Sequence, residues 1–224
     1  MKQTKSMKLA LNMDYNVSMY KKKPFYSFIK RLADIVLSLI LLILFSWLYV
    51  ILWLLVKLTS KGPAFYGHVR VGKNGKHFKV WKFRSMKMDS RPLEEIFTKE
   101  QMEEYKRDFK VTNDPRITTF GKFLRKTSLD ELPQLWNVFI GQMSFVGFRP
   151  ILDEEYEKYG ENKELLTKLK PGITGYWASH GRSLTSYDDR IKMELYYSVN
   201  YSLWLDIRIF FHTFIGVLKS EGAK

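Results

Sequence analysis

The stretch from Ile35 to Val56 reads IVLSLILLILFSWLYVILWLLV and contains 22 residues without a single charge. At about 1.5 Å per residue, a straight helix of this length measures roughly 33 Å, enough to cross the hydrocarbon core of a bilayer. A helix that is apolar on all sides is typical of membrane insertion rather than of a soluble core. The stretch is too long and begins too late to be a cleaved signal peptide. We therefore expect a membrane helix within residues 30–58.

Basic clusters lie on both sides of this apolar run, at residues 21–31 and 57–84. The positive-inside rule therefore assigns it no direction. A re-entrant helix, which enters and leaves the bilayer on the cytoplasmic side, satisfies both clusters but needs a break. We expect the membrane helix break at Ser46, whose hydroxyl can bond a freed carbonyl. The run contains no Pro or Gly, so a straight spanning helix stays open as the alternative.

The composition favours an anionic partner. Lys and Arg number 37 against 23 Asp and Glu, which gives a formal net charge of +14 and a pI near 9.7. Nucleic acid, a phosphorylated small molecule and an anionic lipid surface all fit this charge. The absence of cysteine excludes disulfides and thiolate metal sites, and the four histidines show no metal-ligand spacing.

The remaining sequence divides around the apolar run. Residues 1–29 are polar and basic, and they predict a flexible cytoplasmic arm. Residues 59–224 predict a cytoplasmic, membrane-associated domain. Within it, Asn74-Gly75 between two alternating runs predicts a β-hairpin. Helical patterns follow at residues 90–110, 117–141, 154–170 and 188–218.

The last helical stretch is rich in aromatic residues and fits two interpretations. It is either an amphipathic helix lying on a membrane surface or a helix of the core. The expected fold class is α+β and mainly helical, with a re-entrant N-terminal membrane helix. The expected fold also contains a small cytoplasmic domain with a β-hairpin and interfacial amphipathic helices.

Two adjacent acids, Asp130 and Glu131, stand in the run TSLDELPQL at residues 127–135. One interpretation is structural, because Ser128 and Glu131 fit a capping box and acids favour the first turn of a helix. The other is functional, because free N–H groups at a helix start attract phosphate and keep nearby carboxylates ionised. An ionised aspartate can attack phosphorus or hold Mg²⁺ that bridges phosphate oxygens. Taken alone, the pair fits the structural interpretation better.

Basic residues close to this pair in the sequence could neutralise a diphosphate. Most of them, taken singly, also fit a solvated surface. They are Arg116, Lys122, Arg125, Lys126 and Arg149.

An ordered series of motifs runs from about residue 30 to about residue 218. These are KRLAD (30–34), KGP (61–63), RVGKNGK (70–76), KFRSM (82–86), DPRIT (114–118), GKFLR (121–125), TSLDELPQLW (127–136), GQMS (141–144), RP (149–150) and PGITG (171–175). In these motifs the chain resembles the bacterial sugar transferases, also called monotopic phosphoglycosyl transferases.

The resemblance implies a phosphoglycosyl transferase that moves a sugar 1-phosphate from a UDP-sugar to undecaprenyl phosphate by a ping-pong mechanism. This is the first membrane step of exopolysaccharide, capsule or glycoconjugate synthesis. The resemblance makes Asp130 the nucleophile that expels UMP and forms a covalent phosphosugar-aspartate. It makes Glu131 the partner in Mg²⁺ or proton handling, and both acids the expected Mg²⁺ ligands. The expected contacts to phosphate or nucleotide are Lys82, Arg84, Arg125 and Arg149.

The resemblance also implies partners and a location. The partners are the UDP-sugar, undecaprenyl phosphate and membrane lipids, with no nucleic acid, and a homodimer is one possible assembly. The location is the cytoplasmic face of the bacterial inner (plasma) membrane, where residues 59–224 form the catalytic domain. We expect the chain to lack the multi-helix N-terminal domain of longer members. The alternatives are a membrane-anchored basic binding protein and an inactive family member.

Three departures from the family pattern stand out. Trp47 follows Ser46 where the family usually has Pro, which weakens the prediction of a re-entrant helix. Phe148 replaces a Pro before Arg149. The stretch GYWASHGR at residues 175–182 differs from the usual one, so donor specificity could differ from that of relatives.

Overall fold

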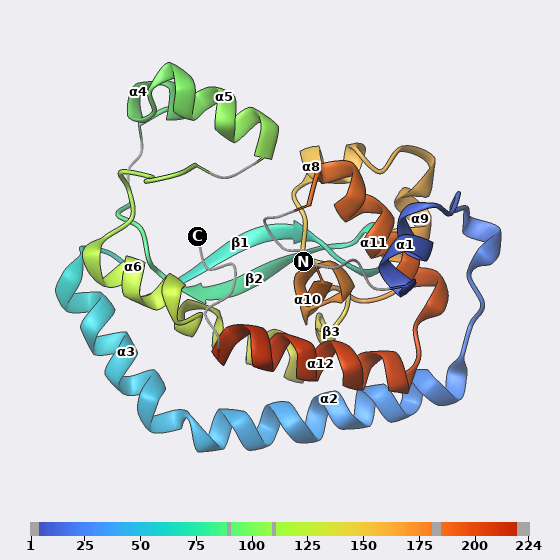
Figure 1. Cartoon of the computed structure of the whole chain (residues 1–224). Coiled ribbons are helices and arrows are strands. Elements are labelled where there is room, and N and C mark those ends of the chain that lie inside the picture. Colours follow the sequence, from blue (N-terminus) through green and yellow to red (C-terminus); the bar gives the residue numbers. More distant parts are fainter. Residues whose placement is uncertain (1–4, 89–90, 109–110, 181–184, 219–224) are drawn as a thin grey trace. The chain divides into compact units, whose positions relative to one another are not determined.

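The computed structural model describes residues 5–88, 91–108, 111–180 and 185–218 (Figure 1). These form two compact units. The larger unit holds the described residues of 1–44, 67–81 and 134–222, and the smaller unit holds those of 45–66 and 82–133. The expected class, α+β and mainly helical, is confirmed.

The larger unit contains most of the helices and one pair of short strands. Its elements are α1 (Lys5–Leu11), η1 (Val17–Met19), α2 (Pro24–Leu44), α7 (Gln134–Phe139), β3 (Ser144–Val146), α8 (Asp153–Glu157), η4 (Gly160–Asn162), α9 (Lys163–Thr167), β4 (Gly172–Thr174), α10 (Tyr176–His180), α11 (Tyr187–Asn200) and α12 (Leu203–Leu218).

The smaller unit contains α3 (Ser46–Thr59), α4 (Leu93–Ile96), α5 (Lys99–Asp108), α6 (Thr119–Lys126) and η3 (Leu129–Glu131). A hairpin of β1 (Phe65–Val71), η2 (Lys73–Gly75) and β2 (His77–Phe83) contributes residues to both units. Asn74 and Gly75 have φ of 57° and 73°, the left-handed conformation that these residue types tolerate best. The predicted hairpin is therefore confirmed.

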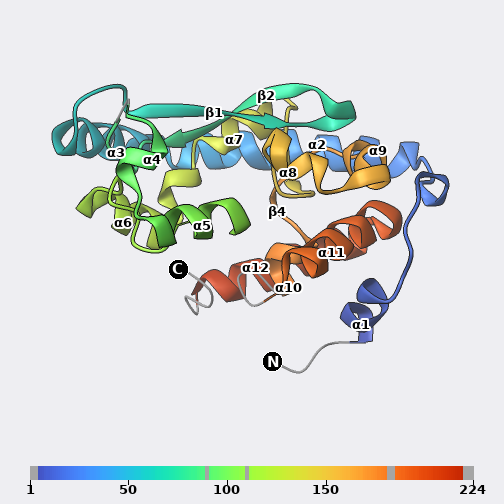
Figure 2. The same ribbon diagram turned by 90° about the horizontal axis from the view of Figure 1, so that it is seen from above.

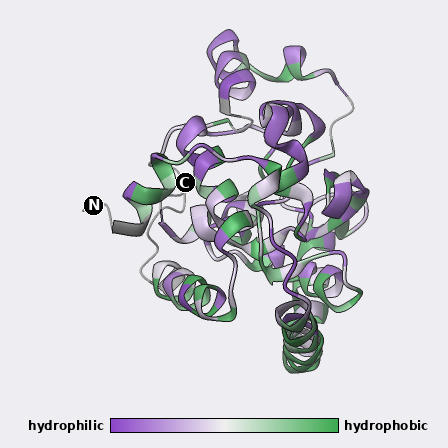
Figure 3. Cartoon of the chain, turned by 90° about the vertical axis from the view of Figure 1, so that its right-hand side faces the viewer, coloured by the Kyte–Doolittle hydropathy of each residue, from purple (hydrophilic) through white to green (hydrophobic). Residues whose placement is uncertain are grey.

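The apolar run is not one continuous helix. It is divided between α2 and α3, which are bent by 63° at a break between Leu44 and Ser46. The break itself is at Phe45, and Ser46, the residue expected there, is the first residue of α3. In the described ranges no single helix is long and apolar enough to cross a membrane, but the bent pair passes that test together. Figure 3 colours the chain by hydropathy, and the lowest part of the ribbon in that view is mostly green, the colour of hydrophobic residues.

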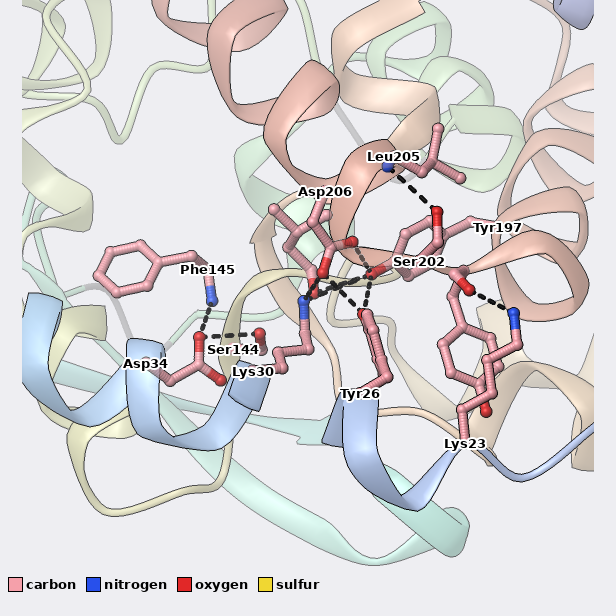
Figure 4. Close-up of polar contacts among 12 residues, drawn as sticks. Lys23, Tyr26, Lys30, Asp34, Ser144, Phe145, Tyr197, Ser202, Leu205 and Asp206 are labelled. Carbon is pink, nitrogen blue, oxygen red and sulfur yellow. Dashed lines mark hydrogen bonds and ion pairs between the residues drawn. The ribbon is translucent and has the colours of Figure 1, made fainter. Parts of the chain in front are cut away.

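Polar residues in the first half of α2 bond this helix to other elements of the larger unit (Figure 4). The carboxylate of Asp34 accepts hydrogen bonds from the hydroxyl of Ser144 at 3.0 Å and from the backbone N–H of Phe145 at 3.1 Å. Lys30 pairs with Asp206 of α12 at 2.6 Å. The guanidinium of Arg31 donates to the carbonyls of residues 138 and 139, at the C-terminus of α7, both at 2.8 Å. The KRLAD motif therefore joins α2 to β3, α7 and α12.

Within residues 1–29, for which the sequence predicts a flexible arm, α1 packs against α11. Met7 and Ala10 are buried there, and the hydroxyl of Tyr15 donates to the carbonyl of Ala10 at 2.8 Å. Lys23 donates to the carbonyl of Tyr201 at 2.6 Å. The described part of this segment thus contributes side chains to the core.

The prediction of one helix over 154–170 is wrong, because the structure has α8, η4 and α9 in its place. Gly160 has a φ of 52°, a conformation that ends a right-handed helix. The strands β3 and β4 pair in parallel, with Ser144 opposite Gly172. Both consist of three residues, too short for an alternating pattern to predict. Helices α10, α11 and α12 gather on one side of the larger unit (Figure 2).

Candidate active site

A backbone bridge shapes the smaller unit around the acidic pair. Met86 pairs with Ile117 in an antiparallel bridge, and the N–H of Thr118 donates to the carbonyl of Ser85 at 3.1 Å. Thr118 also caps α6, because its hydroxyl accepts from the N–H of Gly121 at 2.8 Å. A Cβ at Gly121 would come within 1.9 Å of the Ser85 carbonyl oxygen, so only glycine fits. This bridge brings β2 and α6 to the same site.

An apolar cluster supports the site from α3. It consists of Leu52, Val56, Ala64, Phe83 and Leu124, with Leu48, Tyr49, Phe120, Leu129 and Leu132 packed against it. The hydroxyl of Tyr49 donates to the carbonyl of Leu132 at 2.5 Å. The second half of the apolar run is therefore bonded directly to the segment that carries the two acids.

The two acids lie in the 3₁₀ turn η3, and the capping-box interpretation is wrong. Ser128 makes no side-chain capping bond, and only its carbonyl accepts the N–H of Glu131, at 3.2 Å. The φ of Ser128 is 57°, a left-handed conformation that costs a residue with a Cβ about 1–2 kcal/mol. Strain of this kind is often found at functional sites.

Asp130 and Glu131 point into different surroundings. Asp130 is 6% exposed. The side chain of Glu131 is 37% exposed, and its Oε1 accepts a hydrogen bond from the ammonium of Lys82 at 2.6 Å. Lys82 is 36% exposed on its side chain. One carboxylate is thus shielded from water, while the other forms an ion pair at the edge of the site.

The surroundings of Asp130 set its charge state. Burial raises its pKa to about 6, and the charge of Glu131 adds to this rise. The positive charges of Lys82 and Arg125 and its own backbone N–H lower the pKa. At pH 7 a carboxyl with this pKa is ionised about ten to one. Asp130 is therefore a desolvated anion held between two cations, a suitable state for a nucleophile.

Arg125 and Lys82 supply the positive charge near Asp130. Arg125 lies on α6, and its Nε donates to the hydroxyl of Ser85 at 2.9 Å. Burial lowers the pKa of Arg125, and the charges of Asp130 and Asp114 oppose that effect. A guanidinium stays protonated despite such a shift.

Arg84, also expected to contact phosphate, forms hydrogen bonds with the turn after α3. It is 5% exposed and donates to the hydroxyl of Ser60 at 3.2 Å and to the Ser60 carbonyl at 2.7 Å. Its Nη1 is buried without a partner among the described residues. A Cβ at Gly62 would lie 2.5 Å from that atom, which explains the glycine in the KGP motif.

Arg116 makes a contact that the sequence analysis missed. Its guanidinium forms a two-pronged ion pair with Asp114, and it lies 4.8 Å from the ring centre of Phe97 in the segment just after α4. The signal was present, because Asp-Pro-Arg predicts a turn in which the Asp side chain accepts from the residue two positions on. That bond is observed at 2.9 Å. Arg116 is thus tied to a carboxylate.

Arg149 belongs to the larger unit. Its backbone N–H donates to Glu194 Oε1 at 3.2 Å, and its guanidinium lies 5.8 Å from the ring centre of Trp177. Phe148, the departure before it, is 1% exposed and packs in a cluster with Val71 and Ile151. Phe148 is therefore a core residue.

The first part of the unusual stretch at residues 175–182 belongs to the core. Tyr176 and Trp177 are buried, and the indole N–H of Trp177 donates to Thr185 at 2.9 Å. His180 stacks on Tyr176 with ring centres 4.2 Å apart. Positions 181 and 182 lie outside the described residues.

The donor set of the site fits a magnesium ion that is completed by substrate. No group of three or more His, Cys, Asp or Glu side chains lies together among the residues that the structure describes. Asp130 and Glu131 offer two carboxylates. Mg²⁺ is commonly held by one or two carboxylates together with substrate phosphates and water. The two acids therefore suit an ion that arrives with a diphosphate.

Comparison with known proteins gives a consistent family. The profile of the bacterial sugar transferase family matches residues 25–220. The chain is 48% identical over 199 residues to an undecaprenyl-phosphate galactose phosphotransferase of Salmonella typhimurium (strain LT2), covering 88% of this chain and 42% of that relative. It is 41% identical over 204 residues to the exopolysaccharide production protein ExoY of Rhizobium meliloti (strain 1021), covering 90% of each.

A UDP-glucose:undecaprenyl-phosphate glucose-1-phosphate transferase of Escherichia coli (strain K12) is 42% identical over 204 residues, covering 87% of this chain and 41% of that relative. The chain thus spans less than half the length of the Salmonella and Escherichia relatives. The profile match covers most of the chain and includes every motif of the site. The chain belongs to the bacterial sugar transferase family.

Proposed function

We propose that the chain transfers a sugar 1-phosphate from a UDP-sugar to undecaprenyl phosphate, giving undecaprenyl-diphospho-sugar and UMP. The observation that carries the proposal is the buried carboxylate of Asp130 beside Lys82, Glu131 and Arg125. Two relatives, 48% and 42% identical to the chain, are named undecaprenyl-phosphate galactose phosphotransferase and UDP-glucose:undecaprenyl-phosphate glucose-1-phosphate transferase.

The reaction proceeds in two displacements. In the first, a carboxylate oxygen of Asp130 attacks the phosphorus that bears the sugar, and the bond from that phosphorus to the UMP oxygen breaks. UMP leaves with the electron pair. In the second, a phosphate oxygen of undecaprenyl phosphate attacks the same phosphorus, and the bond to Asp130 breaks. The aspartate is regenerated, and the sugar stays attached to its phosphate throughout.

The neighbours of Asp130 assist by charge. Lys82 and Arg125 favour the anionic nucleophile and offset the charge of the incoming diphosphate. Glu131 holds the ammonium of Lys82 in place. Mg²⁺, bound by the two carboxylates and the substrate phosphates, would neutralise charge on the leaving UMP. Arg149 contacts the donor phosphates in this proposal.

The exposed apolar side chains support a reaction at a lipid surface. On α12, Trp204, Phe211 and Phe214 are 62%, 59% and 56% exposed. On α3, Val50 is 67% exposed. Apolar side chains at such exposure favour burial in lipid over contact with water. We therefore place α2 and α3 in the cytoplasmic leaflet as a re-entrant pair, with α12 in the interface.

The test is UMP release from a UDP-sugar by the purified protein with undecaprenyl phosphate. Asp130→Asn is expected to abolish release, and a phosphosugar adduct on the peptide that contains Asp130 is expected by mass spectrometry. Asp153→Asn is the matched control, because the side chain of Asp153 is 69% exposed and pairs with His77 at 2.7 Å. Full turnover in Asp130→Asn, or an adduct on another residue, would disprove the covalent role.

A further inference from the structure

A group of buried charges lies in the larger unit, separate from the acidic pair. We call Glu155, Arg190 and Glu194, together with the half-buried Arg149, the buried charge cluster. Glu155 on α8 and Glu194 on α11 are 2% and 1% exposed, and Arg190 on α11 is 6% exposed. Charged residues are rarely buried to this degree unless they are paired or have a specific role.

One half of this cluster is an ordinary buried ion pair. The guanidinium of Arg190 donates to Glu155 Oε1 at 2.9 Å. The other oxygen of Glu155 accepts the backbone N–H of Leu152 at 3.0 Å, which caps α8. Arg190 also lies 4.8 Å from the ring centre of Trp177. Glu155 is therefore paired, whereas Nε and Nη2 of Arg190 are buried without a partner among the described residues.

Glu194 has a different pattern of contacts. Its Oε1 accepts the backbone N–H of Arg149 at 3.2 Å, whereas its Oε2 is buried without a partner among the described residues. Burial raises the pKa of Glu194 to about 7, and the charges of Arg190 and Arg149 oppose this rise. A carboxylate in this position is costly compared with an apolar residue of the same size. The hydrogen bond that its carboxylate accepts among the described residues comes from the backbone N–H of Arg149.

The backbone around Arg149 is fixed on both sides. The carbonyl of Phe148 accepts the N–H of Gly172 at 2.8 Å, and the Phe148 ring is in the core. Pro150 restricts the backbone of Arg149 to extended conformations. The hydrogen bond that the Arg149 N–H donates to Glu194 fixes the backbone between these two constraints. Together they set the direction in which the Arg149 side chain leaves the chain.

We propose that Glu194 is a positioning residue for Arg149: its carboxylate holds the Arg149 backbone so that the guanidinium is presented to the donor diphosphate. The inference rests on the proposed function, in which Arg149 contacts the donor phosphates. It adds a residue on α11, 45 positions further along the chain, to the determinants of donor affinity.

The first test measures position and does not depend on activity. Hydrogen exchange at the Arg149 amide is followed by mass spectrometry in the full-length protein. Glu194→Leu removes the acceptor and fills the space, so protection at this amide is expected to fall about tenfold. Glu194→Gln keeps an acceptor oxygen and is expected to retain protection. Unchanged protection in Glu194→Leu would overturn the proposal.

A buried neighbour on the same helix supplies the structural control. Met193 is fully buried in a cluster with Val146 and Tyr176. Met193→Ala is expected to lower the melting temperature without selective loss of protection at Arg149. If it deprotects the Arg149 amide as strongly as Glu194→Leu does, the effect is general loosening of α11 and the proposal is wrong.

The second test measures the kinetic consequence by a double-mutant cycle. Glu194→Leu is expected to raise KM for the UDP-sugar about tenfold with little change in kcat, and Glu194→Gln is expected to restore most of the affinity. On an Arg149→Ala background, Glu194→Leu is expected to have no further effect on KM. Full additivity of the two changes would overturn the positioning role.

The two tests separate this inference from the proposed function. If Arg149→Ala itself leaves KM unchanged, the proposed contact between Arg149 and the diphosphate is wrong. The exchange measurement then still decides whether Glu194 holds the Arg149 backbone. Loss of UMP release in every variant, including wild type, would count against the proposed reaction alone.

Discussion

The hydroxyl of Tyr49, on the apolar helix α3, donates a hydrogen bond to the carbonyl oxygen of Leu132 at 2.5 Å. Leu132 is two residues after Asp130, and its side chain packs in the same apolar cluster as Tyr49. Helix α3 is thus linked to the acidic turn by a polar bond as well as by packing. In the proposed arrangement, with α3 in the membrane and Asp130 as the nucleophile, this bond would fix the depth of the acidic turn relative to the lipid.

Tyr49→Phe is expected to loosen this link. It removes one hydrogen bond and leaves a half-buried carbonyl without this donor, which costs up to about 1–3 kcal/mol. We expect a lower melting temperature and a several-fold loss of UMP release, with membrane association unchanged. Tyr156→Phe is the control, because the Tyr156 hydroxyl makes a long contact of 3.4 Å to Thr167. Equal effects of the two changes would contradict the prediction.

The charge of Lys82 should be visible in the pH dependence of turnover. Asp130 must be ionised to attack, so kcat/KM is expected to fall as the pH drops through its pKa of about 6. Lys82 lowers that pKa, and Lys82→Met therefore raises it and shifts the acidic limb of the profile to higher pH. Lys82→Arg keeps the charge and should leave the limb in place. If the acidic limb of the pH profile does not shift in Lys82→Met, a group other than Asp130 controls the pH dependence of kcat/KM.

The same burial predicts a stability change in Asp130→Asn. The folded pKa is raised from 3.8 to about 6, so the ionised carboxylate opposes folding at any pH above 6. This cost shrinks as the pH falls from 6 toward 3.8 and is absent below that. The neutral amide removes it, and Asp130→Asn is expected to be more stable at pH 8 by up to about 3 kcal/mol. Thermal midpoints at pH 8 and pH 4 test this, and equal gains at both would contradict it.

Glycine at position 121 is a strict requirement of the site. A Cβ there would lie 1.9 Å from the carbonyl oxygen of Ser85, and backbone cannot move away as a flexible side chain can. Gly121→Ala is expected to cost about 3 kcal/mol or more through backbone displacement. Gly216→Ala is the matched control, because nothing lies within 4 Å of a Cβ at that position of α12. It should stabilise the helix by up to about 1 kcal/mol. Similar melting temperatures for the two variants would contradict the close approach of residue 121 to the Ser85 carbonyl.

Local patterns predicted the parts of this protein that depend on neighbours in sequence. Asn74-Gly75 predicted the hairpin, and the charged stretch at 90–110 predicted the helical segment that contains α4 and α5. Three features depend on distant residues and could not be predicted. Ser128 is left-handed although it looks like a helix cap, and Arg84 is buried against Ser60 although its motif suggests a phosphate contact. Glu194 holds Arg149 across 45 positions, and no local pattern signals that bond.

The acids Asp130 and Glu131 could be found as a pair from sequence, but their different surroundings could not. Burial of one acid and exposure of the other depend on how β2 and α6 meet, through the bridge between Met86 and Ile117. The position of Lys82 follows from the same bridge. Family motifs identify these residues together, and the fold assigns each its environment.

The break in the apolar run gives the last prediction. The family usually has Pro where this chain has Trp47, yet the structure breaks the helix at Phe45 without it. Trp47 is in the first turn of α3, where Pro is tolerated because the N–H groups of a first turn have no partner within the helix. Trp47→Pro is therefore expected to keep both membrane association and UMP release. Trp53→Pro, in the middle of α3, is expected to cost about 3 kcal/mol or more and to abolish activity, since Leu52 and Val56 would leave the cluster under the acidic turn. The two variants carry the same replacement of an exposed tryptophan, 60% and 43% exposed respectively, so lost surface area does not explain a difference between them. If Trp47→Pro is as damaging as Trp53→Pro, the prediction that the break at Phe45 accommodates a proline at position 47 is wrong.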